Sequence, residues 1–113
     1  MATPNNGFEG IIVYTIHKDG CMNGRYYATG NPKGEVYNEI ARKRDGKPQN
    51  LVGDYVCNWI ESGNTQVVGT LKIQPRNKQG VYEVTWQEKG KDIFIGTGFL
   101  LDHNMFAVHY TTK

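Results

Sequence analysis

The fold is decided by a stretch that occurs twice: GDYVCNWIESG at residues 53–63 recurs, 27 positions later and without a gap, as GVYEVTWQEKG at residues 80–90. The pair Tyr55 and Trp59 thereby recurs as Tyr82 and Trp86. Within each copy, aromatic and apolar side chains stand at every second residue, which is the period of a β-strand with one buried face. A turn and a second alternating run follow, so each copy predicts a β-hairpin.

A weaker third copy begins at Gly24-Arg25-Tyr26, with Gly34 at the position of the turn glycine. This copy bears on residues 35–44, whose apolar spacing also suits a short helix. The turn glycine in register favours a strand, and the helix stays open as the alternative.

Two further alternating runs, Phe8 to Ile16 and Met105 to Thr111, flank the repeats. Three hairpins and two flanking strands give about eight strands, and the first and last strand are then free to pair. We therefore expect one all-β domain over residues 1–113, an antiparallel up-and-down meander closing into a small barrel. A curled open sandwich gives the same alternation and stays open.

Composition agrees with many turns and one small core. The 113 residues include 14 glycines, and the formal net charge is only +2. This charge balance argues against a nucleic-acid partner, and no apolar run is long enough to span a bilayer. Residues 1–7 lack the features of a signal peptide, so we expect a cytoplasmic protein with Cys21 and Cys57 as free thiols.

Gly96 and Gly98 stand on one face of an alternating run. Glycines inside a strand often mark a bend or the close approach of a bulky neighbour. We expect a bend here or a bulky neighbour such as Trp59 or Trp86.

The strand count and meander order resemble the streptavidin-like and calycin group of eight-stranded barrels. The resemblance covers Phe8 to Tyr110 by pattern and not by a diagnostic motif. It implies a small molecule bound inside the barrel or at its mouth.

The sequence lacks characteristic features of three branches of this group. Only His17 to Gly20 separate the first two alternating runs, which leaves no room for the two helices of fatty-acid-binding relatives. The lipocalin Gly-x-Trp is absent, since no Trp precedes Trp59. No avidin-type set of biotin-binding residues maps onto this chain, so no biotin residue is carried over.

The candidate ligand-binding residues are six aromatic residues on corresponding faces of the repeats. In a barrel, their rings would stack on a ligand and their polar tips would hydrogen-bond it. The alternative is that they fill the core, because an eight-stranded barrel is only just wide enough for its own side chains. The six are Tyr26, Tyr55, Trp59, Tyr82, Trp86 and Tyr110.

Other polar residues give weaker signals. His17, His103 and His109 are scattered without ligand spacing, so no metal or cofactor is predicted. The basic run Arg42 to Arg44, with Lys47, is interpreted as a solvated surface. Glu61 and Glu88 recur before turns and are interpreted as turn residues, so no catalytic residue is predicted.

The function predicted is therefore a non-enzymatic binding protein that holds an apolar or aromatic small molecule. One alternative is a homo-oligomeric interaction module without a ligand, in which Val52, Val56, Ile60 and Val68 are buried in a dimer. The other alternative is an isomerase or cyclase that uses the barrel interior.

Overall fold

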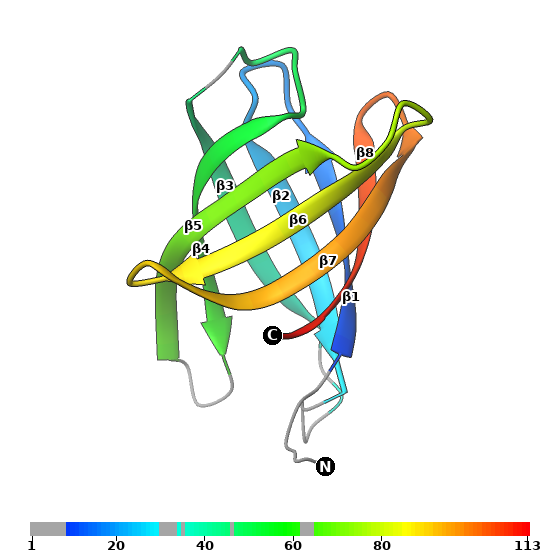
Figure 1. Ribbon diagram of the computed structural model, residues 1–113. Helices are drawn as coiled ribbons and strands as arrows, with labels where there is room; N and C mark the ends of the chain where they lie inside the picture. The colour runs from blue at the N-terminus through cyan, green and yellow to red at the C-terminus, as the bar shows by residue number, and fades with distance from the viewer. Residues whose placement is uncertain (1–8, 30–33, 35, 46, 62–64) are drawn as a thin grey trace.

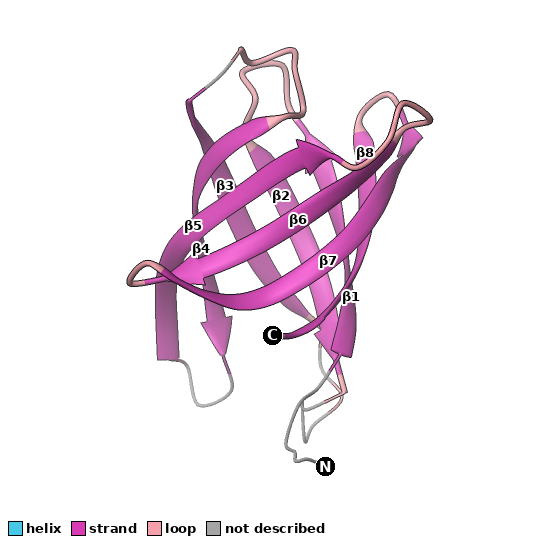
Figure 2. Cartoon of the chain, in the orientation of Figure 1, coloured by secondary structure: helices cyan, strands magenta, loops and turns pink. Residues whose placement is uncertain are grey.

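Eight antiparallel strands follow one another along the chain, and each pairs with the next (Figures 1 and 2). The computed structural model describes residues 9–29, 34, 36–45, 47–61 and 65–113, without the side chain of Glu61. The predicted all-β meander is confirmed. The strands are β1 (Glu9–Ile16), β2 (Met22–Ala28), β3 (Tyr37–Asp45), β4 (Gly53–Glu61), β5 (Thr65–Pro75), β6 (Val81–Glu88), β7 (Lys91–Asp102) and β8 (Met105–Thr112).

The sheet closes because β1 also pairs with β8, from Glu9 opposite Thr111 to Thr15 opposite Met105. The protein is thus a closed barrel and not a curled open sandwich. Closure gives every described strand two hydrogen-bonded neighbours, so no sheet edge is left open among them. The described residues contain no helix long and apolar enough to cross a membrane.

Residues 37–45 form a strand, which confirms that prediction over the helix alternative. Strand β3 is paired with β2 on one side and with β4 on the other. Several predicted features lie outside the described residues: Phe8 at the start of the first run, residues 1–7, residue 35 and the turn at residues 62–64.

The barrel has two different ends. We call the end at which β1 begins and β8 ends the lower end, as drawn in Figure 1. The opposite, upper end carries the turns that join β1 to β2, β3 to β4, β5 to β6 and β7 to β8. The upper part of the interior is tightly filled, since Met22, Ile73 and Phe106 are completely buried.

The two strong sequence copies fall on neighbouring hairpins, β4–β5 and β6–β7. Tyr55 and Tyr82 lie near the starts of β4 and β6 at the upper end, and Trp59 lies toward the lower end of β4. The third copy is not in register with them, because Tyr26 lies near the end of β2 and therefore at the lower end.

Gly96 and Gly98 do accommodate bulky neighbours, but these are not tryptophans. A Cβ placed on Gly98 would lie 2.7 Å from Cγ2 of Val108, and one on Gly96 would lie 2.8 Å from Cγ1 of the same valine. The predicted close approach of a bulky neighbour is therefore confirmed, with Val108 in the place for which Trp59 and Trp86 were named as examples. Trp59 instead lies beside Gly69, on the adjacent strand of its own hairpin.

Candidate functional site

Among the described residues, Glu39 on β3 is the one charged side chain in the buried core, with an exposed fraction of 4%. Two donors reach its carboxyl group. The hydroxyl of Tyr14 on β1 donates to Oε2. Nε1 of Trp86 on β6 donates to Oε1 at 3.2 Å and lies 3.3 Å from Oε2. These hydrogen bonds offset part of the cost of burying the carboxyl group.

The contact between Tyr14 and Glu39 depends on a glycine between them. Gly24 on β2 pairs with Tyr14 on one side and with Glu39 on the other. A Cβ on Gly24 would lie 2.8 Å from ring atoms of Tyr14. The missing side chain therefore leaves the space in which the tyrosine ring crosses β2 and reaches β3.

The buried position changes the acidity of this group. Burial raises the pKa of Glu39 to about 7, although the hydrogen bonds from Tyr14 and Trp86 pull it downward. Burial and the neighbouring Glu39 charge raise the pKa of Tyr14 well above its ordinary value, so Tyr14 stays protonated. Burial and the same charge also raise the pKa of Cys57. No Lys, Arg or His is ion-paired with Glu39 among the described residues.

An aromatic cluster adjoins this carboxyl group and consists of Trp59, Trp86, Phe94 and Tyr110. The ring of Tyr110 lies 5.3 Å from that of Trp86 and 5.6 Å from that of Phe94, centroid to centroid. Phe94 also meets Trp86 and Trp59 edge to face, at 6.4 and 6.5 Å. Such tilted and edge-to-face contacts are the favoured packing of aromatic rings.

At the upper end, Ile16, Leu51 and Tyr82 pack on the core and are only partly buried. The buried core residues themselves keep a small exposed fraction only in the lower part of the barrel. Every core residue with an exposed fraction of at least 3% lies there, whereas the remaining core residues are at 2% or less. Glu39 lies in this lower part, next to the aromatic cluster. The residues with this residual exposure are Ala28, Glu39, Trp59, Val67, Trp86 and Tyr110.

The six aromatic residues predicted from the sequence do not form one site. Tyr26, Trp59, Trp86 and Tyr110 lie toward the lower end, and the hydroxyl of Tyr26 donates to the carbonyl of Ile60 at 2.6 Å. Tyr55 and Tyr82 lie in the upper part. There, Tyr55 donates to the carbonyl of Leu51 at 2.7 Å, and Tyr82 packs edge to face on Phe106.

Sequence reasoning missed Glu39, Tyr14 and Phe94. A signal for Glu39 was present, because it alternates with Tyr37 and Ala41 and therefore shares the inward face of β3. This alternation did not identify Glu39 as an inward residue, because the apolar spacing of residues 35–44 also suited a helix. The partner Tyr14 was not identifiable, because its contact depends on the register of three strands.

The basic run at residues 42–44 is not a uniform solvated surface. Arg42 and Arg44 are exposed, but Lys43 turns into the upper end of the barrel. Its Nζ donates to the carbonyls of Asn50 and Val52, the latter at 2.9 Å, and lies 4.7 Å from the ring centroid of Tyr55. Burial lowers the pKa of Lys43.

The three histidines lie apart from the interior site. His109 faces outward, and its Nε2 lies 3.2 Å from a carboxylate oxygen of Glu9. His103 contacts Asp102, and His17 contacts Asn23. Within the part of the chain that the structure describes, no group of His, Cys, Asp and Glu is arranged to hold a metal ion.

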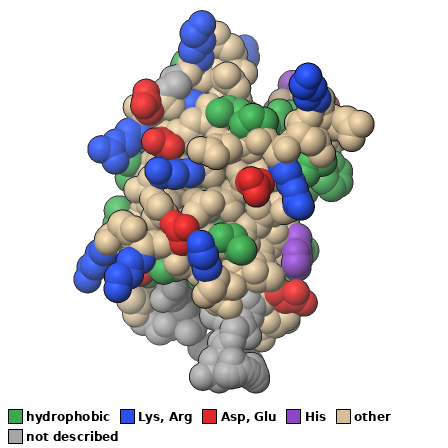
Figure 3. All heavy atoms as spheres, viewed as in Figure 1, with side chains coloured by type: hydrophobic (Ala, Val, Ile, Leu, Met, Phe, Trp, Pro, Cys, Tyr) green, Lys and Arg blue, Asp and Glu red, His purple; other side chains and the backbone are tan. Residues whose placement is uncertain are grey.

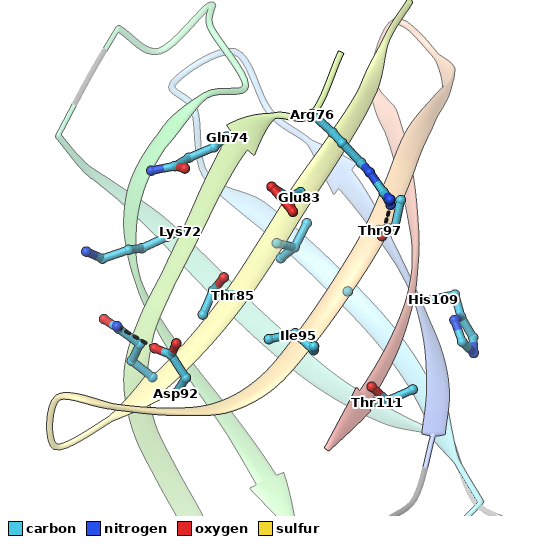
Figure 4. A pocket seen from close by; sticks show the side chains of 13 residues that line it. Lys72, Gln74, Arg76, Glu83, Thr85, Asp92, Ile95, Thr97, His109 and Thr111 are labelled. Carbon is cyan, nitrogen blue, oxygen red and sulfur yellow. Dashed lines mark hydrogen bonds between the residues drawn. The ribbon is translucent and has the colours of Figure 1, made fainter. Parts of the chain in front are cut away.

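The outer face of β5 to β8 carries a shallow hollow of about 460 Å³ (Figure 4). Polar side chains of this hollow form hydrogen bonds with one another: Arg76 donates to Thr97 at 3.2 Å, and Gln87 donates to Asp92 at 2.7 Å. Acidic and basic groups are interspersed over this side of the molecule (Figure 3). The mixed charge and open shape select no class of ligand, so the interior site is the better candidate.

Comparison with protein-family models, with curated proteins and with solved structures finds no match for this chain. The protein belongs to the class of eight-stranded antiparallel meander barrels, and its interior holds a hydrogen-bonded carboxyl group.

Proposed function

We propose that the protein is a non-enzymatic binding protein that holds an apolar or aromatic small molecule at the lower end of the barrel. The observation that carries this proposal is the buried carboxyl group of Glu39, which is hydrogen-bonded to Trp86 of the aromatic cluster in the lower part of the barrel. Trp59, Phe94 and Tyr110 supply ring surface for such a molecule, and the carboxyl group of Glu39 supplies a polar anchor. A largely apolar site with a few placed polar groups is the usual form of a small-molecule site.

The barrel architecture agrees with this proposal. Eight-stranded meander barrels of the calycin and streptavidin-like group bind small molecules in the interior or at the mouth. We propose membership of that group on the strand order and closure alone, and a fold by itself does not identify a ligand.

The test is tryptophan fluorescence of the full chain during titration with 2-phenylethanol. We expect a saturable change, because the chain has two tryptophans and both belong to the aromatic cluster. Trp59→Ala should weaken binding by about tenfold or more, since it removes a ring at the site. Phe99→Ala is the matched control, because Phe99 is exposed on the outer face of β7. A linear response that is the same in all three proteins would contradict the proposal.

A homo-oligomer is the second candidate, and an outer apolar face favours it. Ile40 on β3 and Val68 on β5 flank Asn58 in one cross-strand row, and Val56 and Ile60 stand on either side of Asn58 along β4. All four apolar side chains are at least 37% exposed. Val52, the fourth predicted dimer residue besides Val56, Ile60 and Val68, is only partly exposed.

An isomerase or cyclase is the third candidate, and Glu39 favours it, because a buried carboxyl group with a raised pKa suits proton transfer. This candidate differs from simple binding in one measurable respect. If the interior is catalytic, Glu39→Gln abolishes turnover of a bound molecule, whereas a binding protein turns nothing over with either residue.

A further inference from the structure

The Glu39 carboxyl group has acceptor capacity that the described part of the chain does not use. An ionised carboxylate offers about four acceptor positions, whereas the described donors to Glu39 are two side chains, Tyr14 and Trp86. Both are neutral, so they hydrogen-bond the carboxylate without neutralising its charge. A buried carboxylate without a counter-ion is costly unless a positive group joins it.

The aromatic side chains near this carboxylate also favour a positive group. The faces of aromatic rings attract cations, and tryptophan does so most strongly. Trp86 touches the carboxylate, and Tyr110 and Phe94 pack on Trp86 within 6.4 Å, centroid to centroid. A cation at the lower end would thus meet aromatic rings on its way to an acceptor.

We propose that the ligand of this site is a small organic cation, namely a protonated amine on an aromatic or apolar body, with its N–H groups directed at Glu39. This inference rests on the proposed function and adds the charge of the ligand. Since no Lys, Arg or His among the described residues is ion-paired with Glu39, an anion would meet the Glu39 charge without a cationic partner there, and a neutral molecule would leave an ionised Glu39 uncompensated.

Among the described residues, the titratable groups whose pKa the Glu39 charge raises remain neutral near physiological pH. They are Tyr14 on β1, Cys57 on β4 and Tyr110 on β8, and burial raises the pKa of each. Gly24 of β2 pairs with Glu39, and Val67 of β5 and Phe94 of β7 are apolar residues of the same core. Since the pKa of Glu39 is about 7, affinity for a cation should rise as the pH increases through this value.

The experiment compares three probes of matched shape: phenethylammonium, neutral 2-phenylethanol and anionic phenylacetate. The readout is the pair of indole N–H signals of the isotopically labelled full chain, measured by NMR at pH 8. We expect phenethylammonium to bind about tenfold or more tightly than 2-phenylethanol, and phenylacetate to bind more weakly than either. Lowering the pH to 5.5 should remove the advantage of the cation, because Glu39 is then protonated.

Glu39→Gln should abolish both the preference for phenethylammonium over 2-phenylethanol and the pH dependence of this preference. Asp92→Asn, which alters an exposed carboxylate, should leave both unchanged. If Glu39→Gln does not fold, the pH series on the unaltered chain decides the question. Equal affinity for the cation and the alcohol at pH 8, or tightest binding of the anion, overturns the inference and leaves the proposed function standing. If none of the probes shifts either indole signal, both fail.

Discussion

Glu39 and Trp86 lie 47 residues apart in the chain, yet Nε1 of the indole is 3.2 Å from a carboxylate oxygen of Glu39 inside the barrel. The contact joins β3 to β6, which are not neighbours in the sheet. It also connects the buried charge to the aromatic cluster, so a change in the ionisation of Glu39 acts directly on the rings at the lower end.

Stability should decrease as the pH rises from about 5 to about 8. The pKa of Glu39 is about 7 in the folded protein, against an ordinary value of 4.5, so the folded state holds the proton more tightly. The proton on Glu39 therefore stabilises the folded state. This stabilisation is fully present below pH 4.5 and is lost as the pH rises through about 7. The loss is roughly 3 kcal/mol at most. Urea denaturation at a series of pH values measures it.

Glu39→Gln is the control for this pH dependence, because glutamine does not titrate. The slope of stability against pH between 5 and 8 should flatten in this variant. The lowered pKa values of Asp19, Asp92 and Asp102 affect stability only at more acidic pH. An unchanged slope in Glu39→Gln would show that another group is responsible.

Trp86→Phe should move the midpoint of this stability loss to higher pH. The indole N–H lowers the pKa of Glu39, so its removal leaves the carboxylate with one donor fewer. Trp59→Phe is the matched control, since it makes the same change at the corresponding tryptophan of the other sequence copy. Equal midpoints in the two variants would mean that the Trp86 hydrogen bond does not stabilise the charge.

Gly24→Ala should destabilise the protein by about 1–3 kcal/mol, the usual cost of inserting a methyl group into a filled core. The new Cβ would collide with the ring of Tyr14 and displace its hydroxyl from Glu39. Asn23→Ala, at an exposed position on the same strand, should change stability far less. Thermal unfolding of the two variants tests the difference, and equal midpoints would contradict this role of Gly24.

Lys43→Met should loosen the segment before β4. The Lys43 ammonium holds the carbonyls of Asn50 and Val52, and the loss of these hydrogen bonds should cost about 1 kcal/mol. We expect faster backbone amide exchange at residues 47–52 and no such change in Arg42→Met, which alters an exposed neighbour. Protection equal to that of the unaltered chain would contradict the anchoring role.

Ile60→Asp tests the oligomer candidate. If the outer face around Asn58 is buried between copies, a charge there should dissociate the assembly into single chains. Light scattering during size-exclusion chromatography measures the molar mass. A single-chain mass already in the unaltered protein would remove this candidate, and an oligomer that survives Ile60→Asp would place its interface elsewhere.

Strand positions and inward faces were predictable from the sequence, because period-two alternation is a local property. Trp59, Trp86 and Tyr110 are inward for this reason. The division of the aromatic residues between two ends was not predictable, because the third copy is out of register and Tyr26 therefore lies far from Tyr55. The contacts of Glu39 and the inward turn of Lys43 depend on strand register and closure, which alternation alone does not determine.

Native mass spectrometry of the gently purified protein tests the central claim most directly. The claim predicts a mass above the 12.8 kDa of the chain, with one small molecule bound per chain and lost in Trp59→Ala but retained in Phe99→Ala. A bare chain or a bare oligomer, with no added mass in any of the three proteins, would contradict it.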